Sequence, residues 1–120
     1  MLNEIQSLIH RQIILNLTIR TFEHERNQLT TFKMQRAFAT WFDVKIKELQ
    51  QDLITTKSEL GKLGVKIQSD RVDGEVTEYA VLVRGNADTR RYMNVALRNW
   101  VEEETNRLLG MPYHTPEDRK

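Results

Sequence analysis

The segment ATWFDVKIKELQQDLITTKSELGKLG, residues 39–64, carries the strongest structural signal in the sequence. Its apolar residues recur in alternating steps of three and four, which is the spacing of one buried helical face. The members of this stripe are Ala39, Phe42, Ile46, Leu49, Leu53, Thr56, Leu60 and Leu63, and Met34 and Phe38 extend it towards the N-terminus. Gly61 and Gly64 favour a helix end. The pattern predicts a long amphipathic helix that ends near residue 63.

A second stripe with the same spacing lies upstream. Its members are Ile5, Leu8, Gln12, Leu15, Ile19, Phe22, Arg26 and Leu29. Its phase does not continue into the later stripe, because it would then place Lys33 and Arg36 at core positions. The intervening residues 27–32 include Asn and Thr, which are poor helix formers. We expect a turn there and an antiparallel helical hairpin over residues 2–63, with one bent helix of about 60 residues as the alternative.

Downstream of the helices, the pattern changes to one typical of strands. Residues 64–85 predict a β-hairpin, because Asp73-Gly74 is a two-residue turn signal between two alternating runs. That turn would place Ile67 opposite Ala80 and Val65 opposite Leu82. The second strand is apolar on both faces, so it needs cover on two sides or a further strand from another chain.

A third helix is predicted over residues 87–109. Its apolar face comprises Met93, Ala96, Leu97, Trp100, Val101 and Leu108. Asn86 or Asp88 is a suitable N-cap, and Gly110 is a suitable C-terminal stop. We expect one domain over residues 1–110, of class α+β and predominantly helical, in the order ααββα. Residues 111–120 are predicted to form a mobile tail.

The composition excludes several classes of protein. The 120 residues contain 18 Lys and Arg, 17 Asp and Glu, and no cysteine. The missing thiols exclude disulfide frameworks, thiolate zinc sites and iron–sulfur ligation. The longest apolar run is Ile13-Ile14-Leu15, far below the roughly 20 residues of a membrane span, and the N-terminus lacks the features of a signal peptide. We therefore expect a cytoplasmic protein that has no membrane partner.

Motifs of catalysis are missing from the sequence. His10, His24 and His114 belong to different predicted elements, and no metal-binding spacing joins them. The glycines are scattered as turns and helix stops and form no phosphate-binding loop. No arrangement resembles a Ser-His-Asp triad. We expect a protein without enzymatic activity, cofactor or metal.

Four arginines form a candidate contact site for an anion or a partner: Arg84, Arg90, Arg91 and Arg98. The predicted third helix carries Arg90 and Arg91 in its first turn and Glu102–Glu104 in its second half, the reverse of what the helix dipole favours. Arg84 precedes this helix closely, so the arginines would converge near a helix N-terminus, where anions bind. The alternative is that they pair with acids of the same fold.

Four further residues form a candidate interface: Trp41, Tyr79, Val81 and Val83. Trp41 lies one position off the seam of its helix, and an exposed large aromatic side chain is typical of an interface. A homodimer is expected for three reasons. They are the long apolar seam, a second apolar line on the first helix (Leu2, Ile9, Ile13, Leu17) and the strand that is apolar on both faces.

These observations lead to three hypotheses of function. The first is a small regulator, inhibitor or adaptor that acts by protein–protein interaction as a homodimer. The second is nucleic-acid binding by the four arginines, with Lys66 and Arg71 as additions from the hairpin, which would weaken steeply as salt rises. The third is binding of a small phosphorylated ligand or nucleotide, with Tyr79 or Tyr92 stacked on the base.

Overall fold

The structure, a computed structural model, describes residues 2–31 and 33–115 of the chain. Its elements follow in the order α1 (Leu2–Arg26), α2 (Gln35–Lys62), β1 (Val65–Asp73), β2 (Val76–Val83), β3 (Asn86–Met93) and α3 (Asn94–Leu108). The predicted class, α+β and predominantly helical, is confirmed. The predicted order ααββα is wrong, because a third strand precedes the last helix.

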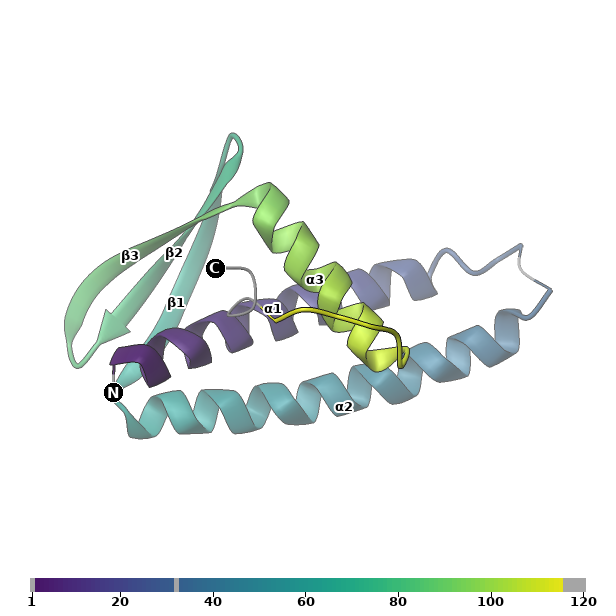
Figure 1. Ribbon diagram of the computed structural model, residues 1–120, viewed down its shortest axis with the longest axis horizontal. Coiled ribbons are helices and arrows are strands. Elements are labelled where there is room, and N and C mark those ends of the chain that lie inside the picture. Colours follow the sequence, from purple (N-terminus) through teal and green to yellow (C-terminus); the bar gives the residue numbers. More distant parts are fainter. Residues whose placement is uncertain (1, 32, 116–120) are drawn as a thin grey trace.

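The predicted helical hairpin is confirmed. Helices α1 and α2 run antiparallel and set the longest dimension of the molecule, 51 Å (Figure 1). At the end of α1 the hydrogen bonds shorten to three-residue spacing, with the N–H of Asn27 donating to the carbonyl of His24 and that of Gln28 to Glu25. Such bonds tighten and end a helix. The alternative of one bent helix is therefore wrong.

Helix α1 lies at the centre of the fold, with α2, the sheet and α3 around it (Figure 1). Its predicted stripe packs against α2 through Leu15, Ile19 and Phe22. In the second apolar line, Ile9 and Ile13 are buried against the sheet and α3, and Leu17 is half-buried, while the side chain of Leu2 lies outside the described part of the structure. Since the same chain covers this line, it gives no support to a homodimer.

The β-hairpin forms, but in a different register from the predicted one. Asp73 pairs with Val76, so the turn residues are Gly74 and Glu75. Gly74 takes a φ of +63°, as the first central residue of a type II′ turn does. A bulge between Ile67 and Ser69 then shifts the pairing again. The result places Ile67 opposite Val81, and Val65 opposite Val83.

Residues 86–93 form the edge strand β3 where the sequence predicts the first turns of a helix. Arg84 (φ +52°) and Gly85 (φ +82°) make a two-residue turn with both φ values positive, as in type I′. Helix α3 begins only at Asn94, and no side chain caps its N-terminus. The prediction of Asn86 or Asp88 as N-cap is therefore wrong, as is the predicted start at residue 87.

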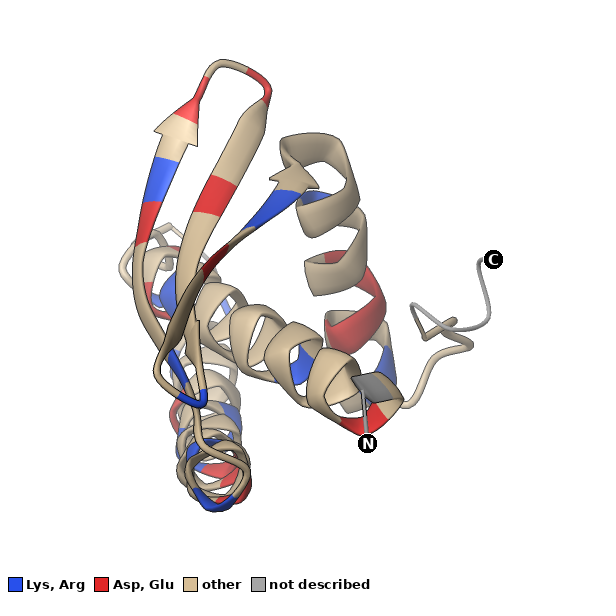
Figure 2. Cartoon of the chain, turned by 90° about the vertical axis from the view of Figure 1, so that its left-hand side faces the viewer, with Lys and Arg blue, Asp and Glu red and all other residues tan. Residues whose placement is uncertain are grey.

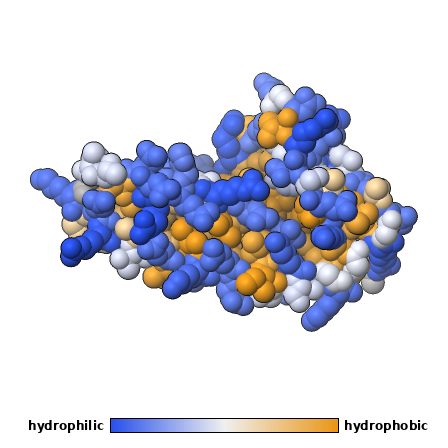
Figure 3. Space-filling model, turned by 180° about the vertical axis from the view of Figure 1, so that it is seen from behind, coloured by the Kyte–Doolittle hydropathy of each residue, from blue (hydrophilic) through white to orange (hydrophobic). Residues whose placement is uncertain are grey.

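The three strands are antiparallel in the order β1-β2-β3, so the apolar β2 lies in the middle. Thr77, Tyr79 and Val81 of β2 are buried on the face that packs on α1. The second strand thus finds a neighbouring strand and a covering helix within its own chain. On the far side of the molecule, apolar side chains lie between hydrophilic ones without joining into one patch (Figure 3).

Residues 111–115 have no helix or strand but lie along α3. The Met111 N–H donates to the Asn106 carbonyl at 2.8 Å, and the His114 N–H donates to a Glu103 carboxylate oxygen. The rest of the predicted mobile tail, residues 116–120, lies outside the described residues. Within the described part of the chain, none of the helices is both long and apolar enough to cross a membrane.

Candidate functional site

An apolar groove lies between the first turns of α2 and the end of α3. Its volume is about 550 Å³, and we call it the α2–α3 groove. The lining residues are Met34, Ala37, Phe38, Trp41, Phe42, Thr105 and Leu109. Met34, Phe38 and Trp41 follow one another at steps of four and three, which places them on one side of α2. Thr105, in the last turn of α3, and Leu109, which directly follows this helix, form the opposite wall.

Large apolar side chains of this groove face solvent. Met34 is 62 % exposed, Phe38 47 % and Leu109 51 %. The prediction that Met34 and Phe38 extend the core stripe is therefore wrong, because α1 has already ended where they project. Exposed apolar residues that adjoin one another indicate a binding surface more strongly than scattered ones do.

Trp41 anchors the floor of the groove. Its ring contacts Phe22 of α1, with centroids 5.6 Å apart, and Phe42, with centroids 5.4 Å apart. The indole is half-buried, with one side in this aromatic cluster and another towards the groove. A large aromatic side chain that is already held in place loses little entropy on binding, which is typical of interaction hot spots.

A separate, positively charged cleft of about 490 Å³ lies on another side of the first turns of α2. Its lining residues are Arg26, Leu29, Lys33, Gln35, Arg36 and Ala39. Arg26 is paired with Asp43 through contacts of 2.6 and 3.1 Å. The first turn of α2 contains no acidic residue, so the positive end of its helix dipole adds to the charges of Lys33 and Arg36.

Thr105 joins the α2–α3 groove to a second hollow of about 720 Å³. This second hollow lies between the sheet and α3. Leu17, Leu97 and Val101 give it apolar walls, and Val72 of β1 faces it from the hairpin. One side of α3 is therefore bordered by apolar hollows along most of its length.

Of the four predicted interface residues, Trp41 alone lines the α2–α3 groove. Tyr79 and Val81 are buried against α1, and Val83 packs beside the same core cluster. The prediction of Tyr79 and Val81 as interface residues is wrong, because α1 supplies the cover that the sequence assigned to another chain. Val83 is half-buried, so its place in an interface stays a prediction.

The four predicted arginines do not form one site. Arg84 lies in the turn before β3, whereas Arg98 lies on α3 and lines the second hollow. Arg90 and Arg91 are neighbours in β3, so their side chains leave opposite faces of the sheet. Arg90 pairs with Asp88 at 3.0 Å, and Arg91 with Glu78 at 3.5 Å.

Because Arg90 and Arg91 belong to a strand, the predicted conflict between arginines and the helix dipole does not exist for them. Arg90 and Arg91 instead pair with acidic residues of the same chain, which was the alternative hypothesis for these arginines. Figure 2 shows the two signs of charge interspersed on the strands and helices rather than a face of one sign.

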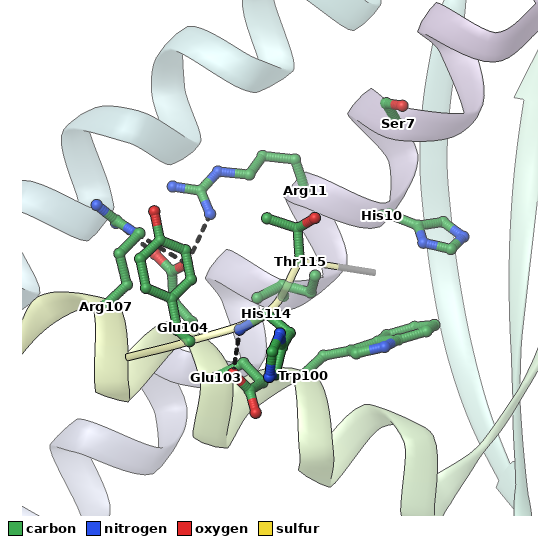
Figure 4. Close-up of a pocket in the computed structure, with 11 residues that line it drawn as sticks. Ser7, His10, Arg11, Trp100, Glu103, Glu104, Arg107, His114 and Thr115 are labelled. Carbon is green, nitrogen blue, oxygen red and sulfur yellow. Dashed lines mark hydrogen bonds and ion pairs between the residues drawn. The ribbon is translucent and has the colours of Figure 1, made fainter. Parts of the chain in front are cut away.

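A cluster of buried charge was not among the residues predicted from the sequence. Glu104 of α3 is 6 % exposed and accepts hydrogen bonds from Arg11 of α1 and Arg107 of α3 (Figure 4). Burial on its own raises the pKa of Glu104, but the hydrogen bonds from Arg107 and Arg11 outweigh it and lower that pKa. Arg11 also reaches Asp52 of α2 at 3.2 Å, so the cluster ties three helices together.

A cavity of about 340 Å³ adjoins this cluster, between α1, α3 and residues 113–115 (Figure 4). His10, Trp100 and His114 line it beside the charged groups. Among the described residues, no group of three or more His, Asp or Glu side chains is placed to hold a metal ion. Since Glu104 engages both guanidinium groups, the cluster is suited to holding the helices in position.

A comparison with models of known families identifies the family of this chain. The model of a family described as YhjD protein matches residues 1–113. The chain belongs to the YhjD family. A relative in this comparison is the uncharacterised protein YhjD of Bacillus subtilis (strain 168), 28 % identical over 102 residues, which cover 83 % of this chain and 85 % of the relative. No solved structure matches the chain. The name of the YhjD family states no activity, substrate or partner.

Proposed function

We propose that this protein is a small non-enzymatic regulator or adaptor of the cytoplasm that works as a homodimer and binds another protein through the α2–α3 groove. The observation that carries the proposal is the exposure of Met34, Phe38 and Leu109 around the half-buried Trp41. The exposed surface of Met34, Phe38 and Leu109 is apolar, and burying it on a partner is favourable by the hydrophobic effect.

The shape of the groove defines the partner that it fits. Met34, Phe38 and Trp41 follow at one-turn spacing along one wall, and Thr105 and Leu109 form the other. An amphipathic helix with apolar residues at steps of three and four complements such walls.

Nucleic-acid binding has less support than protein binding. Asp88 and Glu78 already pair with Arg90 and Arg91, and Arg84 and Arg98 lie on other elements. The same separation weakens the case for a phosphorylated ligand, because such a site needs several donors directed at one anion.

Capture from the native host tests the proposal. Tagged wild type is compared with Phe38→Glu and with Ile54→Glu, a control that alters another exposed apolar residue of α2 (62 % exposed) outside the groove. We expect one partner to be lost with Phe38→Glu and retained with Ile54→Glu, and the purified partner to bind the wild type directly. A partner that Phe38→Glu retains and an Arg90→Ala/Arg91→Ala double variant loses would place the interaction on β3 and overturn the proposal.

A further inference from the structure

Strand β3 is an edge strand with a regular backbone. Within residues 2–31 and 33–115, β2 is the one strand that pairs with it. The eight pairs from Val76–Met93 to Val83–Asn86 continue without a bulge, and β3 contains no proline. The opposite edge, β1, is interrupted by the bulge at Gln68. Bulges and prolines are devices that keep edges from pairing with another chain, so β3 is the edge that remains competent to pair.

The turn before β3 determines which backbone groups face the open side. In a two-residue hairpin the pair that flanks the turn, here Val83 and Asn86, is hydrogen-bonded. Because hydrogen-bonded pairs alternate along antiparallel strands, Asp88 and Arg90 direct their N–H and C=O groups to β2, and Thr89 directs its own outward. The Thr89 N–H indeed donates to its neighbouring Asp88 carboxylate, at 2.8 Å. This carboxylate occupies the position that a carbonyl of a further strand would take.

We propose that two copies of the chain pair antiparallel through β3, with Thr89 on the two-fold axis, and join their sheets into one of six strands. The proposal rests on the homodimer of the proposed function and gives it a surface. The two Thr89 residues exchange their N–H and C=O groups, and each Asp88 carboxylate is released from its own chain's N–H.

The charges of β3 select this register. With Thr89 opposite Thr89, Asp88 of each copy lies opposite Arg90 of the other, on the same face of the sheet. Each Asp88 then lies between two arginines, since Arg90 of its own chain is already 3.0 Å away. Centring the pair on Asp88 would set two aspartates opposite each other, and centring it on Arg90 would set two arginines opposite each other. Both neighbouring symmetric registers are therefore disfavoured.

The proposal is tested first by the mass in solution. Light scattering behind size exclusion at tens of micromolar should give a dimer for wild type and for Thr89→Val, which keeps the backbone N–H. It should give a monomer for Thr89→Pro, because proline lacks the backbone N–H that bonds to the second copy. Pairing with β2 does not use this N–H. A wild-type monomer would show that Asp88 instead guards the edge, and a Thr89→Pro dimer would show that another surface associates. Either result would overturn the proposal.

Charge exchange gives an independent test that does not depend on the proline variant folding. Asp88→Arg alone and Arg90→Asp alone should each weaken the dimer by about tenfold or more, because like charges then face each other. An equimolar mixture of the two variants should form a heterodimer, in which every opposed pair is again of unlike charge. A mixture that stays monomeric would contradict the proposal. Phe38→Glu should leave the dimer intact, so failure of the groove and failure of the β3 pairing are distinguishable.

Discussion

The Arg11 guanidinium of α1 donates to the Glu104 carboxylate of α3 at 2.9 Å, across 93 residues of sequence. Arg107, one turn further along α3, holds the same carboxylate at 2.6 Å. Helix α3 forms one wall of the α2–α3 groove, so the cluster that fixes how α3 crosses α1 also fixes the geometry of the groove.

Replacing Glu104 by glutamine should lower the free energy of unfolding at neutral pH by about 2 kcal/mol, because hydrogen bonds from charged donors to a buried carboxylate are lost. Urea denaturation of the wild type and Glu104→Gln measures this difference. Glu102→Gln changes an exposed residue of the same helix and should alter stability by less than about 0.5 kcal/mol. Equal stability of the wild type and Glu104→Gln would show that the cluster does not stabilise the fold.

The contribution of Glu104 should also depend on pH. Its pKa in the folded protein lies below the ordinary value of 4.5, so the stabilisation is complete above that value and is lost as pH falls through the folded pKa. The difference between wild type and Glu104→Gln in urea should therefore be largest at neutral pH and shrink in acid. A difference that stayed constant from neutral pH to pH 3 would contradict this explanation.

The Tyr92 hydroxyl is buried and has no hydrogen-bond partner within the described residues. Burial raises the pKa of Tyr92 to about 12. Since an unsatisfied buried polar group is costly, Tyr92→Phe should raise the free energy of unfolding by about 1 kcal/mol. Thermal or urea unfolding checks this, with Tyr113→Phe as an exposed control that should change little. Clear destabilisation by Tyr92→Phe would mean that the hydroxyl has a partner.

Gly64 joins α2 to β1 with a φ of +74°, and a Cβ at this position would lie 3.2 Å from Cγ of Arg84. The Arg84 N–H also donates to the Gly64 carbonyl at 2.7 Å. Gly64→Ala should therefore destabilise the fold by about 1–2 kcal/mol. Gly61→Ala should instead stabilise the fold by up to about 1 kcal/mol, because Gly61 lies in α2 and a Cβ there would have open space around it. Finding the same sign for both substitutions would contradict the role given to Gly64.

The helical hairpin could be predicted from sequence because each stripe repeats over about seven turns, far longer than any competing pattern. Strand β3 could not be predicted from the sequence. Its sequence NADTRRYM contains good helix formers and alternates weakly, and the preceding Arg84-Gly85 is an uncommon pair for a type I′ turn. Pairing with β2 decides its conformation, as tertiary context often does for strands.

The candidate groove could be predicted only in part. Trp41 was identifiable because it lies off the seam of α2, whereas Phe38 and Met34 fit the stripe and are nevertheless exposed. Their exposure depends on where α1 ends and where α3 crosses it. The charge cluster could not be predicted either. The spacing of Glu104 and Arg107 along one helix does not indicate that Arg11 approaches from another helix.

Site-specific photo-crosslinking in the native host shows whether the α2–α3 groove binds another protein. A photoreactive phenylalanine analogue is placed at position 38, inside the groove, or at position 54, the control on the same helix, and the crosslinked peptides are sequenced. We predict one dominant product at position 38, formed with an amphipathic helix of another protein, and no such product at position 54. Equal labelling at the two positions, or a crosslink at position 38 to this chain itself, would mean that the groove is not the site of partner binding.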